Sequence, residues 1–521
     1  MKQIKYKRKT MLIVLISVVA VMLITVVSFA GCGRGSSSCS DNPSDTTPSN
    51  GGSVVRPPEP PEDLENFIPI TSASEFNAIS NNLTGDFRLA ANINLTNHIP
   101  IGNSNEPFSG RFFVPFDDDG IPLYSITNLS ITVAVRSGGS YLVALFGAND
   151  GFISNLKIDN FEVNIDVPNS DEARILVGAI AGDNRGIIEF VNVARSNVNI
   201  NAHNGGIRAG IIAGRNRGEN AVIRYTIANG RLSNNGVLGR SSRAGGIVGI
   251  LEDGATIYRS GSNVAVSAVT TGNGNTSAGG LVGHIQRSGF VRESFAIGNV
   301  VAESRGGGTV YAGGLTGNIN SEDYAMENDR PPNYRWNFAV EQSFATGSAT
   351  ARATGNAYVS GLIARIADNA GTAGDILISQ SYSRGNSVIE AIGPMGSPNH
   401  YIGGLVGRIQ SLEGSVISIE NSFVIGNVTG SGVGSDNFAG ALVGRFHNNG
   451  FREIENLFFS NQTTVNGTMH GLQGVPGSER PATEIAHDTL LTSAWQTANL
   501  GFNNSVWIFT DGQLPRFNWV M

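Results

Sequence analysis

The pentad GGLVG stands at residues 279–283 and returns at 403–407, and pentads of similar small and apolar residues recur along the chain. The related pentads are VALFG (143–147), GAIAG (178–182), GIIAG (210–214), GGIVG (245–249), GGLTG (313–317), SGLIA (360–364) and GALVG (440–444). Such a period is typical of stacked or radial repeats, in which one unit is too short to bury an apolar face alone. The pentads therefore predict a repeat protein of about nine units.

A second run follows several pentads, after a turn rich in Gly, Asn and Asp. Examples are SFAIGNV (294–300), SFATGSA (343–349) and SFVIGNV (422–428). Apolar residues alternate with small or polar ones and are interrupted by Gly and Asn, which predicts short strands rather than helices. The variable segment before the next pentad has room for a third short strand.

The spacing of these runs indicates how the units are arranged. The distance from a pentad to the following second run varies from 8 to 26 residues, whereas the distance onward to the end of the next pentad stays between 21 and 27. A solenoid accepts such insertions at one corner without disturbing its stacked strands. We therefore predict an all-β, right-handed parallel β-helix of about nine coils. A propeller is the alternative, less favoured because each unit offers two or three strands rather than four.

Both ends of the repeat region contain expected capping elements. Ser72 and Glu75 have capping-box spacing and predict a short helix. Residues 482–499 predict a further helix, and residues 506–519 a final strand. We expect these elements to cover the open ends of the solenoid and to prevent edge-to-edge aggregation. The expected parts are an N-terminal cap with first strands (63–140), the β-helix repeats (141–470) and a C-terminal cap (471–521).

The N-terminus has the composition of an export signal. Five basic residues precede an apolar run over 11–29, and Phe29-Ala30-Gly31-Cys32 follows. This tetrapeptide resembles a bacterial lipoprotein lipobox, with Phe29 where Leu, Val or Ile is usual. The resemblance implies a signal peptide over 1–31 and an acylated Cys32 as the mature N-terminus. An uncleaved membrane anchor and ordinary cleavage remain alternatives, and all three place most of the chain outside the cytoplasm.

Residues 32–62 are rich in Ser, Gly, Pro and acidic residues, which predicts a disordered tether. Cys39 is the only other cysteine, so we expect neither a disulfide framework nor a cysteine-based metal site. The predicted location is the bacterial cell envelope, lipid-anchored at the outer membrane or cell surface.

The charge balance bears on possible partners. The chain has 35 basic and 42 acidic residues, and five of the basic ones lie in the leader, which leaves 30 against 42 and a net charge of −12 in the exported part. Only Lys157 among the lysines lies beyond the leader, and the repeats show no evident Lys or Arg cluster. Because nucleic-acid binding needs clustered cations, we expect no nucleic-acid partner.

The pentads and the SFAIGNV-type runs resemble the GLUG-motif repeat family. The flanks also resemble it: ITSASEFNAIS with FRLAANINLTN and IPIG before the repeats, and VWIFTDGQLPRFNW after them. The resemblance covers about residues 68–519, with departures at Ser360 and Ala364 and in the longer segment 114–124. It implies a β-helical domain of a bacterial surface or adhesin-like protein and no single activity.

Motifs of catalysis and metal binding are scarce. There is no HExxH motif, and Asp117-Asp118-Asp119-Gly120 lacks the alternating spacing of a calcium loop, which favours an acidic turn. We predict no catalytic residue, no metal site and no cofactor. The histidines are scattered without an i, i+4 pair and are expected to be structural, at positions 98, 203, 284, 400, 447, 470 and 487.

The best candidate site is a loop. The three longest insertions belong to the sixth, seventh and eighth repeats, so they should emerge side by side, and the longest spans 320–338. Aromatic and acidic residues on a projecting loop suit contact with sugar rings or a protein partner, although a tolerated surface insertion is the alternative. The candidate partner-binding residues are Asp323, Tyr324, Tyr334, Arg335 and Trp336.

These observations favour a lipid-anchored, non-enzymatic surface protein that binds a host, glycan or envelope partner. A polysaccharide lyase or hydrolase is the alternative, and it rests on fold analogy alone. A purely structural envelope component is a third possibility.

Overall fold

The chain divides into two compact units, Met1–Gly51 and Gly52–Met521, and the computed structural model describes residues of the second only. The described residues are 57, 59–131, 135–137, 139–167, 174–202, 206–236, 240–320, 337–367, 375–393, 398–411, 415–431, 437–448, 451–465 and 482–519. The predicted signal peptide, Cys32, Cys39 and residues 33–56 of the tether lie outside them.

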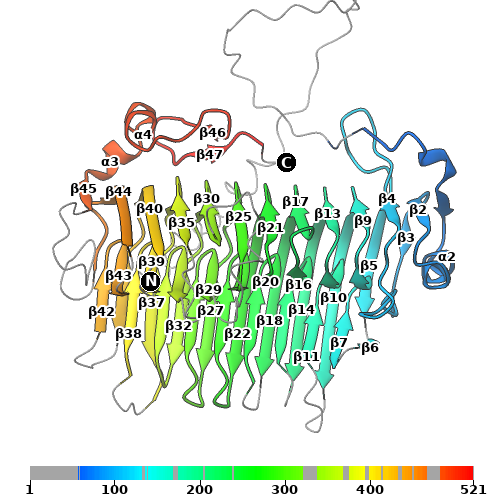
Figure 1. Ribbon diagram of the computed structural model, residues 1–521, viewed down its shortest axis with the longest axis horizontal. Coiled ribbons are helices and arrows are strands. Elements are labelled where there is room, and N and C mark those ends of the chain that lie inside the picture. The colour runs from blue at the N-terminus through cyan, green and yellow to red at the C-terminus, as the bar shows by residue number, and fades with distance from the viewer. Residues whose placement is uncertain are drawn as a thin grey trace, which may run out of the picture. The chain divides into compact units, whose positions relative to one another are not determined.

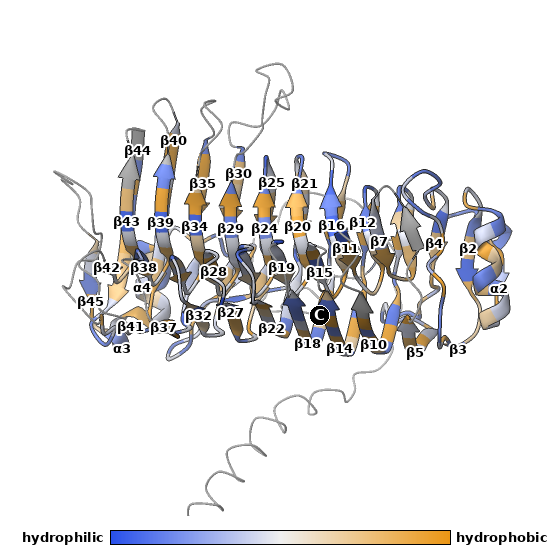
Figure 2. Ribbon diagram, turned by 90° about the horizontal axis from the view of Figure 1, so that it is seen from below, coloured by the Kyte–Doolittle hydropathy of each residue, from blue (hydrophilic) through white to orange (hydrophobic). Residues whose placement is uncertain are grey.

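The second unit is a parallel β-solenoid of about nine turns, which confirms the predicted fold class (Figure 1). Three sheets run along the solenoid, and we number them I, II and III, with the strands of each given below. Each coil passes first through sheet II, then through sheet III and then through sheet I. Within the described residues these sheets contain ten, nine and 26 strands respectively. Hydrophobic segments recur from strand to strand along the stack (Figure 2).

Sheet I contains β1 (Ile68–Ile70), β2 (Asp86–Leu89), β3 (Ile93–Asn94), β4 (Arg111–Phe113), β5 (Ser125–Ile131), β9 (Phe152–Ser154), β10 (Lys157–Val167), β13 (Ile187–Glu189), β14 (Asn192–Ala202), β17 (Val222–Arg224), β18 (Ile227–Gly236), β21 (Ala255–Tyr258), β22 (Gly261–Thr270), β25 (Gly289–Arg292), β26 (Phe295–Ala296), β27 (Val300–Ser304), β30 (Phe338–Glu341), β31 (Phe344–Ala345), β32 (Ala349–Ala353), β35 (Ile376–Ser379), β36 (Tyr382–Ser383), β37 (Ser387–Ala391), β40 (Val416–Val424), β41 (Val428–Ser431), β44 (Phe451–Ser460) and β45 (Thr483–Ile485). Sheet II contains β6 (Val135–Ser137), β7 (Ser140–Val143), β11 (Arg174–Val177), β15 (Ile207–Gly210), β19 (Ser242–Gly245), β23 (Thr276–Gly279), β28 (Val310–Gly313), β33 (Ala357–Ser360), β38 (His400–Gly403) and β42 (Asn437–Gly440). Sheet III contains β8 (Phe146–Asn149), β12 (Ala181–Asn184), β16 (Ala213–Arg217), β20 (Val248–Glu252), β24 (Val282–Gln286), β29 (Thr316–Asn320), β34 (Ile363–Ala367), β39 (Val406–Ser411) and β43 (Val443–Asn448).

Each pentad forms the bend between sheets II and III rather than a strand of its own. In the pentad 279–283, β23 ends at Gly279 and β24 begins at Val282. The last residue, Gly283, lies so close to the preceding coil that a Cβ there would be 2.6 Å from the carbonyl oxygen of Gly249. The small residues of the pentad therefore allow the backbones of neighbouring coils to approach at a sharp bend.

Polar ladders connect successive coils inside the solenoid. The side-chain amide of Asn184 accepts a hydrogen bond from Asn149 and donates one to Asn216, each at 2.7 Å. The serine of the SF-type runs forms a second ladder, in which the backbone N–H of Ser294 donates to Ser343 Oγ at 3.2 Å. These ladders satisfy buried polar groups that would otherwise be costly.

The predicted N-terminal helix is present as α2 (Ala73–Ala78), followed by the 3₁₀ turn η3 (Ile79–Asn81) and preceded by η2 (Leu64–Asn66). Ser72 Oγ accepts the backbone N–H of Glu75 at 3.3 Å, and the Glu75 carboxylate accepts the backbone N–H of Thr71 at 2.6 Å. Phe76 is buried in the solenoid core. The predicted capping-box pair thus fixes the start of the helix.

The C-terminal segment differs from the prediction in form. Residues 482–499 contain β45 and two short helices, α3 (His487–Leu490) and α4 (Ser493–Asn499), because Thr492 caps a new helix through the Trp495 N–H. The expected final strand is an antiparallel hairpin, β46 (Trp507–Ile508) with β47 (Arg516–Phe517).

The position of this hairpin also differs. β45 extends sheet I beyond β44, but the hairpin packs along the side of the solenoid, over the aromatic stack of the SF-type runs (Figure 1). The Phe517 ring lies 5.2 Å from that of Phe344, and the Tyr382 hydroxyl donates to the Pro515 carbonyl at 2.6 Å. The segment covers a hydrophobic stripe because sequence-adjacent coils align their SF aromatic residues in one column.

Candidate functional site: an arginine pocket beside the pentad bend

Two columns of side chains face each other outside the core, where sheets II and III meet. In sheet II the column consists of Leu142, Leu176, Arg208, Arg243, Ser277, Tyr311, Tyr358, Tyr401 and Phe438. In sheet III it consists of Ala148, Asp183, Arg215, Ile250, His284, Asn318, Arg365, Arg408 and Arg445. We call these two rows the corner columns. Their first apolar members pack in a cluster separate from the main core.

The C-terminal half of the corner columns is an arginine–aromatic ladder. Its stacked rings, with centroids 5.1, 4.8 and 5.3 Å apart, belong to Tyr311, Tyr358, Tyr401 and Phe438. The Cζ atom of Arg408 lies 4.7 Å from the Tyr401 ring centroid, and its Nη1 donates to the Tyr358 hydroxyl at 3.1 Å. Arg365 and Arg445 make similar contacts. Each arginine here has an aromatic partner.

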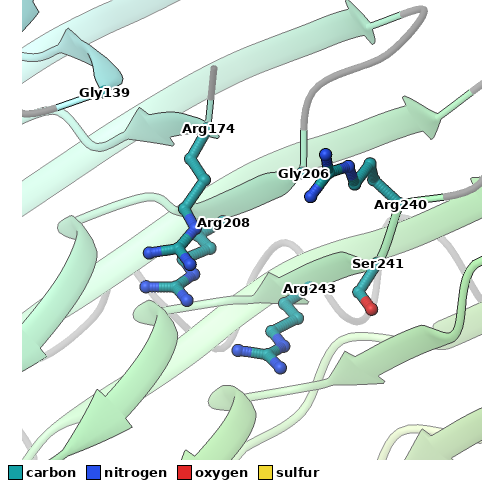
Figure 3. Close-up of a pocket in the computed structure, with 7 residues that line it drawn as sticks. All are labelled: Gly139, Arg174, Gly206, Arg208, Arg240, Ser241 and Arg243. Carbon is teal, nitrogen blue, oxygen red and sulfur yellow. The ribbon is translucent and has the colours of Figure 1, made fainter. Parts of the chain in front are cut away.

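The N-terminal half opens into a pocket of about 480 Å³, which we call the arginine pocket (Figure 3). Its lining consists of Gly139, Arg174, Gly206, Arg208, Arg240, Ser241 and Arg243. Arg208 and Arg243 are half-buried, whereas Arg174 and Arg240 are exposed. In Figure 3 the guanidinium groups of Arg174 and Arg208 are drawn next to each other, that of Arg243 is directed the same way, and that of Arg240 is set apart near Gly206.

Strand register explains why these arginines converge. Arg208 in β15 pairs directly with Arg243 in β19, so their side chains leave the same face of sheet II about 4.8 Å apart. Arg174 is the first residue of the neighbouring strand β11, and Arg240 precedes β19 in the connection from sheet I. Three successive coils therefore contribute cations to one place.

The charge of Arg208 is not balanced by an ion pair or hydrogen bond within the described part of the chain. Burial, followed by the positive charges of Arg243 and Arg174, lowers the pKa of Arg208 to about 9, although Glu252 acts in the opposite direction. The side chain remains a cation at neutral pH. The pocket thus holds a positive charge at an energetic cost.

The neighbouring Arg215 shows the opposite situation. It donates two hydrogen bonds to the fully buried carboxylate of Asp183, at 2.7 and 2.8 Å, and Arg217 also donates to this carboxylate, at 3.0 Å from its Nη2. Burial alone would raise the pKa of Asp183, but hydrogen bonds from these two arginines outweigh it and hold that pKa below its ordinary value. This network is a satisfied ion cluster and leaves little charge for a ligand.

His284 lies between the two halves. Burial, with the charges of Arg243, Arg208 and Arg365, lowers its pKa well below the ordinary value, so the ring is neutral. Its Nδ1 lies 3.3 Å from Asn318 Nδ2, and its buried Nε2 has no hydrogen-bond partner among the residues described. A neutral imidazole beside the pocket adds no positive charge to it.

The predicted loop residues Asp323, Tyr324, Tyr334, Arg335 and Trp336 lie outside the described residues. The strand ends from which the long insertions leave are nonetheless adjacent, since Asn320, Ala367 and Gln410 occupy one register position in β29, β34 and β39. The neighbouring-loop argument therefore holds for the bases of these loops, and the role of the loop residues stays a prediction.

The expectation that the repeats contain no arginine cluster was wrong. Arg208 and Arg243 each stand two residues before the first glycine of their pentads, in RAG and RAGG. Aligning the chain on its pentads would have placed them in one column. Arg174 and Arg240 could not be assigned in this way, because their positions depend on how the corner connections fold.

Other candidate groups have structural surroundings. The Asp117 carboxylate accepts the backbone N–H groups of Asp119 and Ile121, as in an acidic turn. His98 lies between Asn77 Oδ1 and the Leu145 carbonyl, and burial lowers its pKa to about 4. No three His, Cys, Asp or Glu side chains gather closely enough to hold a metal ion in the described ranges. Every helix found there is too short to cross a bilayer.

Comparison with known proteins returns little. No protein-family model matches the chain, and no curated protein sequence matches it. Among solved structures, the chain is similar to a "putative immunoglobulin A1 protease" from Bacteroides ovatus, at 14% identity over 87% of this chain and 93% of that chain, with a TM-score of 0.30. At this level of likeness nothing about activity follows.

Proposed function

We propose that this β-solenoid is a non-enzymatic binding protein of the bacterial cell envelope, lipid-anchored through Cys32, that holds a glycan or protein partner. The carrying observation is the arrangement of the corner columns. They align side chains of successive coils on one face, and in the N-terminal half that alignment places Arg208 and Arg243 at an open pocket, which Arg174 and Arg240 also line. A regular row of this kind suits an extended ligand that follows the solenoid axis.

The binding function is tested with the compact unit formed by residues 52–521. We expect it to bind a subset of an array of acidic and neutral glycans and matrix proteins. Deletion of residues 321–336 tests the loop, and substitution in the arginine pocket tests the corner columns. No binding to any array member would contradict the proposed function, whereas loss in one variant alone identifies the surface used.

The proposed anchor is tested separately. Cys32→Ser should abolish fatty-acid labelling and release the protein from the membrane fraction or leave it as a larger precursor. Cys39→Ser is the matched control and should leave labelling unchanged. Labelling that survives Cys32→Ser would exclude Cys32 as the acylated residue.

A polysaccharide lyase is the second candidate, and one observation favours it: Arg208 has a lowered pKa in a pocket with further cations. Its neutral form could accept the proton from the carbon next to a uronate carboxylate that the other pocket arginines bind, while the glycosidic oxygen leaves from the adjacent carbon and takes a proton from water. Incubation with polyuronates should then produce unsaturated sugar ends, detected by ultraviolet absorbance. Their absence, with binding retained, would favour the non-enzymatic function.

A further inference from the structure

We propose that the arginine pocket is a subsite for the oxyanion groups, sulfate or carboxylate, of an acidic polysaccharide. This inference rests on the proposed binding function and names the chemical class of its ligand. Arg208 and Arg243 would form the floor of the subsite, and Arg174 and Arg240 its rim.

The geometry of the lining carries this assignment. Among the described residues of the lining, the four charged ones are all arginines and none is a carboxylate. The planar guanidinium donates two parallel hydrogen bonds to an oxyanion, which makes arginine better suited than lysine to such recognition. With about 480 Å³ available, the pocket accommodates a charged monosaccharide unit rather than a lone ion.

The free-energy cost of holding the Arg208 charge in the pocket also supports an oxyanion ligand. In sheet III, the ion pair between Arg215 and Asp183, at 2.7 Å, offsets the free-energy cost of burying the Arg215 charge. Arg208 has no comparable partner within the described ranges. A buried cation is stabilised when an anion with matching donors and acceptors arrives. The pocket is therefore better satisfied with an oxyanion than without one.

The distribution of charge favours a polysaccharide over a nucleic acid. The chain has a formal net charge of −7, and the pocket cations are confined to a few coils. A nucleic-acid duplex carries one negative charge per about 1.7 Å, so its remaining phosphates would meet an acidic protein. A polysaccharide with at most a few charges per sugar can place one group in the pocket and extend along the solenoid.

The experiment compares polymers that differ only in charge. Dextran sulfate is matched with dextran, and polygalacturonate with its methyl ester, and binding to residues 52–521 is measured by calorimetry at fixed ionic strength. We expect binding to the charged member of at least one pair and none to its neutral counterpart. Inorganic sulfate is a separate arm and should bind weakly and compete.

Variants locate the site. Arg208→Met should weaken binding about tenfold or more, since it removes a charge-assisted, bidentate contact, and Arg208→Lys should restore it in part. Arg231→Met is the matched control, because Arg231 is exposed on sheet I, outside the pocket lining, and donates to Asn197 Oδ1 at 2.8 Å. It should leave affinity unchanged. In the absence of ligand, Arg208→Met should raise Tm by about 2 °C, because it removes a poorly compensated cation.

Several results would overturn the subsite. Equal affinity for charged and neutral polymers would show that the pocket does not bind the oxyanion. An equal loss of affinity in Arg208→Met and Arg231→Met would show the same. Binding to DNA or anionic vesicles in preference to every acidic polysaccharide would overturn the ligand class. In each of these cases the proposed binding function survives, whereas failure to bind any array member would remove both.

Discussion

The two halves of the corner columns use the same backbone positions for different purposes. At the sheet II position, Arg208 and Arg243 stand in the N-terminal half, and Tyr311, Tyr358 and Tyr401 in the C-terminal half. In the C-terminal half the facing arginines of sheet III lie over those rings and bond their hydroxyl groups. In the N-terminal half Arg208 and Arg243 border an open pocket instead.

This difference separates arginines that pack on aromatic rings and stabilise the fold from arginines that line a pocket, such as Arg208 and Arg243, of which Arg243 also donates to Gln286 Oε1 at 3.3 Å. An arginine packed on an aromatic ring covers apolar surface and has a satisfied donor. An arginine among other cations in a pocket destabilises the folded state unless an anion binds. The comparison therefore predicts opposite responses to the same substitution in the two halves.

The largest loss of folding stability is expected for a substitution in the arginine–aromatic ladder. Tyr358→Ala removes a buried ring stacked between Tyr311 and Tyr401, at 5.1 and 4.8 Å, and should cost about 3–5 kcal/mol. Urea denaturation followed by circular dichroism measures the loss. Tyr358→Phe is the control: it keeps the stack, loses only the bond from Arg408, and should cost about 1 kcal/mol. Similar costs for both variants would mean that stacking does not stabilise this half.

The second effect tests the bend that both halves share. Gly283→Ala would place a Cβ 2.6 Å from the Gly249 carbonyl oxygen and should cost about 1–3 kcal/mol. Gly236→Ala is a matched control, since its Cβ would meet Thr270 Cγ2 at an ordinary 3.4 Å. The seventh pentad carries Ala364 at the equivalent position, where it packs with the tyrosines. If Gly283→Ala did not lower stability, the coils at Gly283 could move apart enough to hold a Cβ, as they do at Ala364 beside the tyrosines.

The contrast between these regions also shows what the sequence could predict. The pentad period and the spacing predict the stacked coils, because parallel stacking converts a sequence repeat into a column of side chains. Ser72 and Glu75 predict α2 because capping is local. The lateral position of the hairpin β46–β47 was not predictable from local pattern, since it depends on the column formed by Phe344 and other SF aromatics far away in the chain.

The arginine pocket was missed for a related reason. Overall charge describes the chain as acidic and says nothing of where the cations gather. Arg208 and Arg243 are 35 residues apart in sequence and become neighbours only through strand register. A column-by-column alignment predicts that pair, whereas Arg174 and Arg240 require the folded connections.

The third prediction compares one substitution in both halves. Arg408→Met removes a cation that lies 4.7 Å from the Tyr401 ring centroid and should destabilise the fold by about 1 kcal/mol. Arg208→Met should instead raise Tm. Thermal unfolding of both variants at one pH gives the comparison. Two changes of the same sign would contradict the division between stabilising and ligand-binding arginines.

The smallest expected effect is a pH dependence of the difference in Tm between Arg208→Met and the unsubstituted protein. In the folded state the pKa of Arg208 is about 9, below the ordinary value of 12.5, so the unfolded chain binds more protons between these values. The cost of Arg208 is therefore fully present below about pH 8 and declines as pH rises through about 9. The higher Tm of Arg208→Met should therefore approach that of the unsubstituted protein between about pH 8 and pH 10. Groups present in both proteins cancel in this difference; one example is Tyr258, because burial raises its pKa to about 12 in both. A bound oxyanion raises the pKa of Arg208, so saturating dextran sulfate should remove this trend. A Tm difference that stays constant over this pH range without ligand would show that Arg208 is not an uncompensated cation in the folded protein.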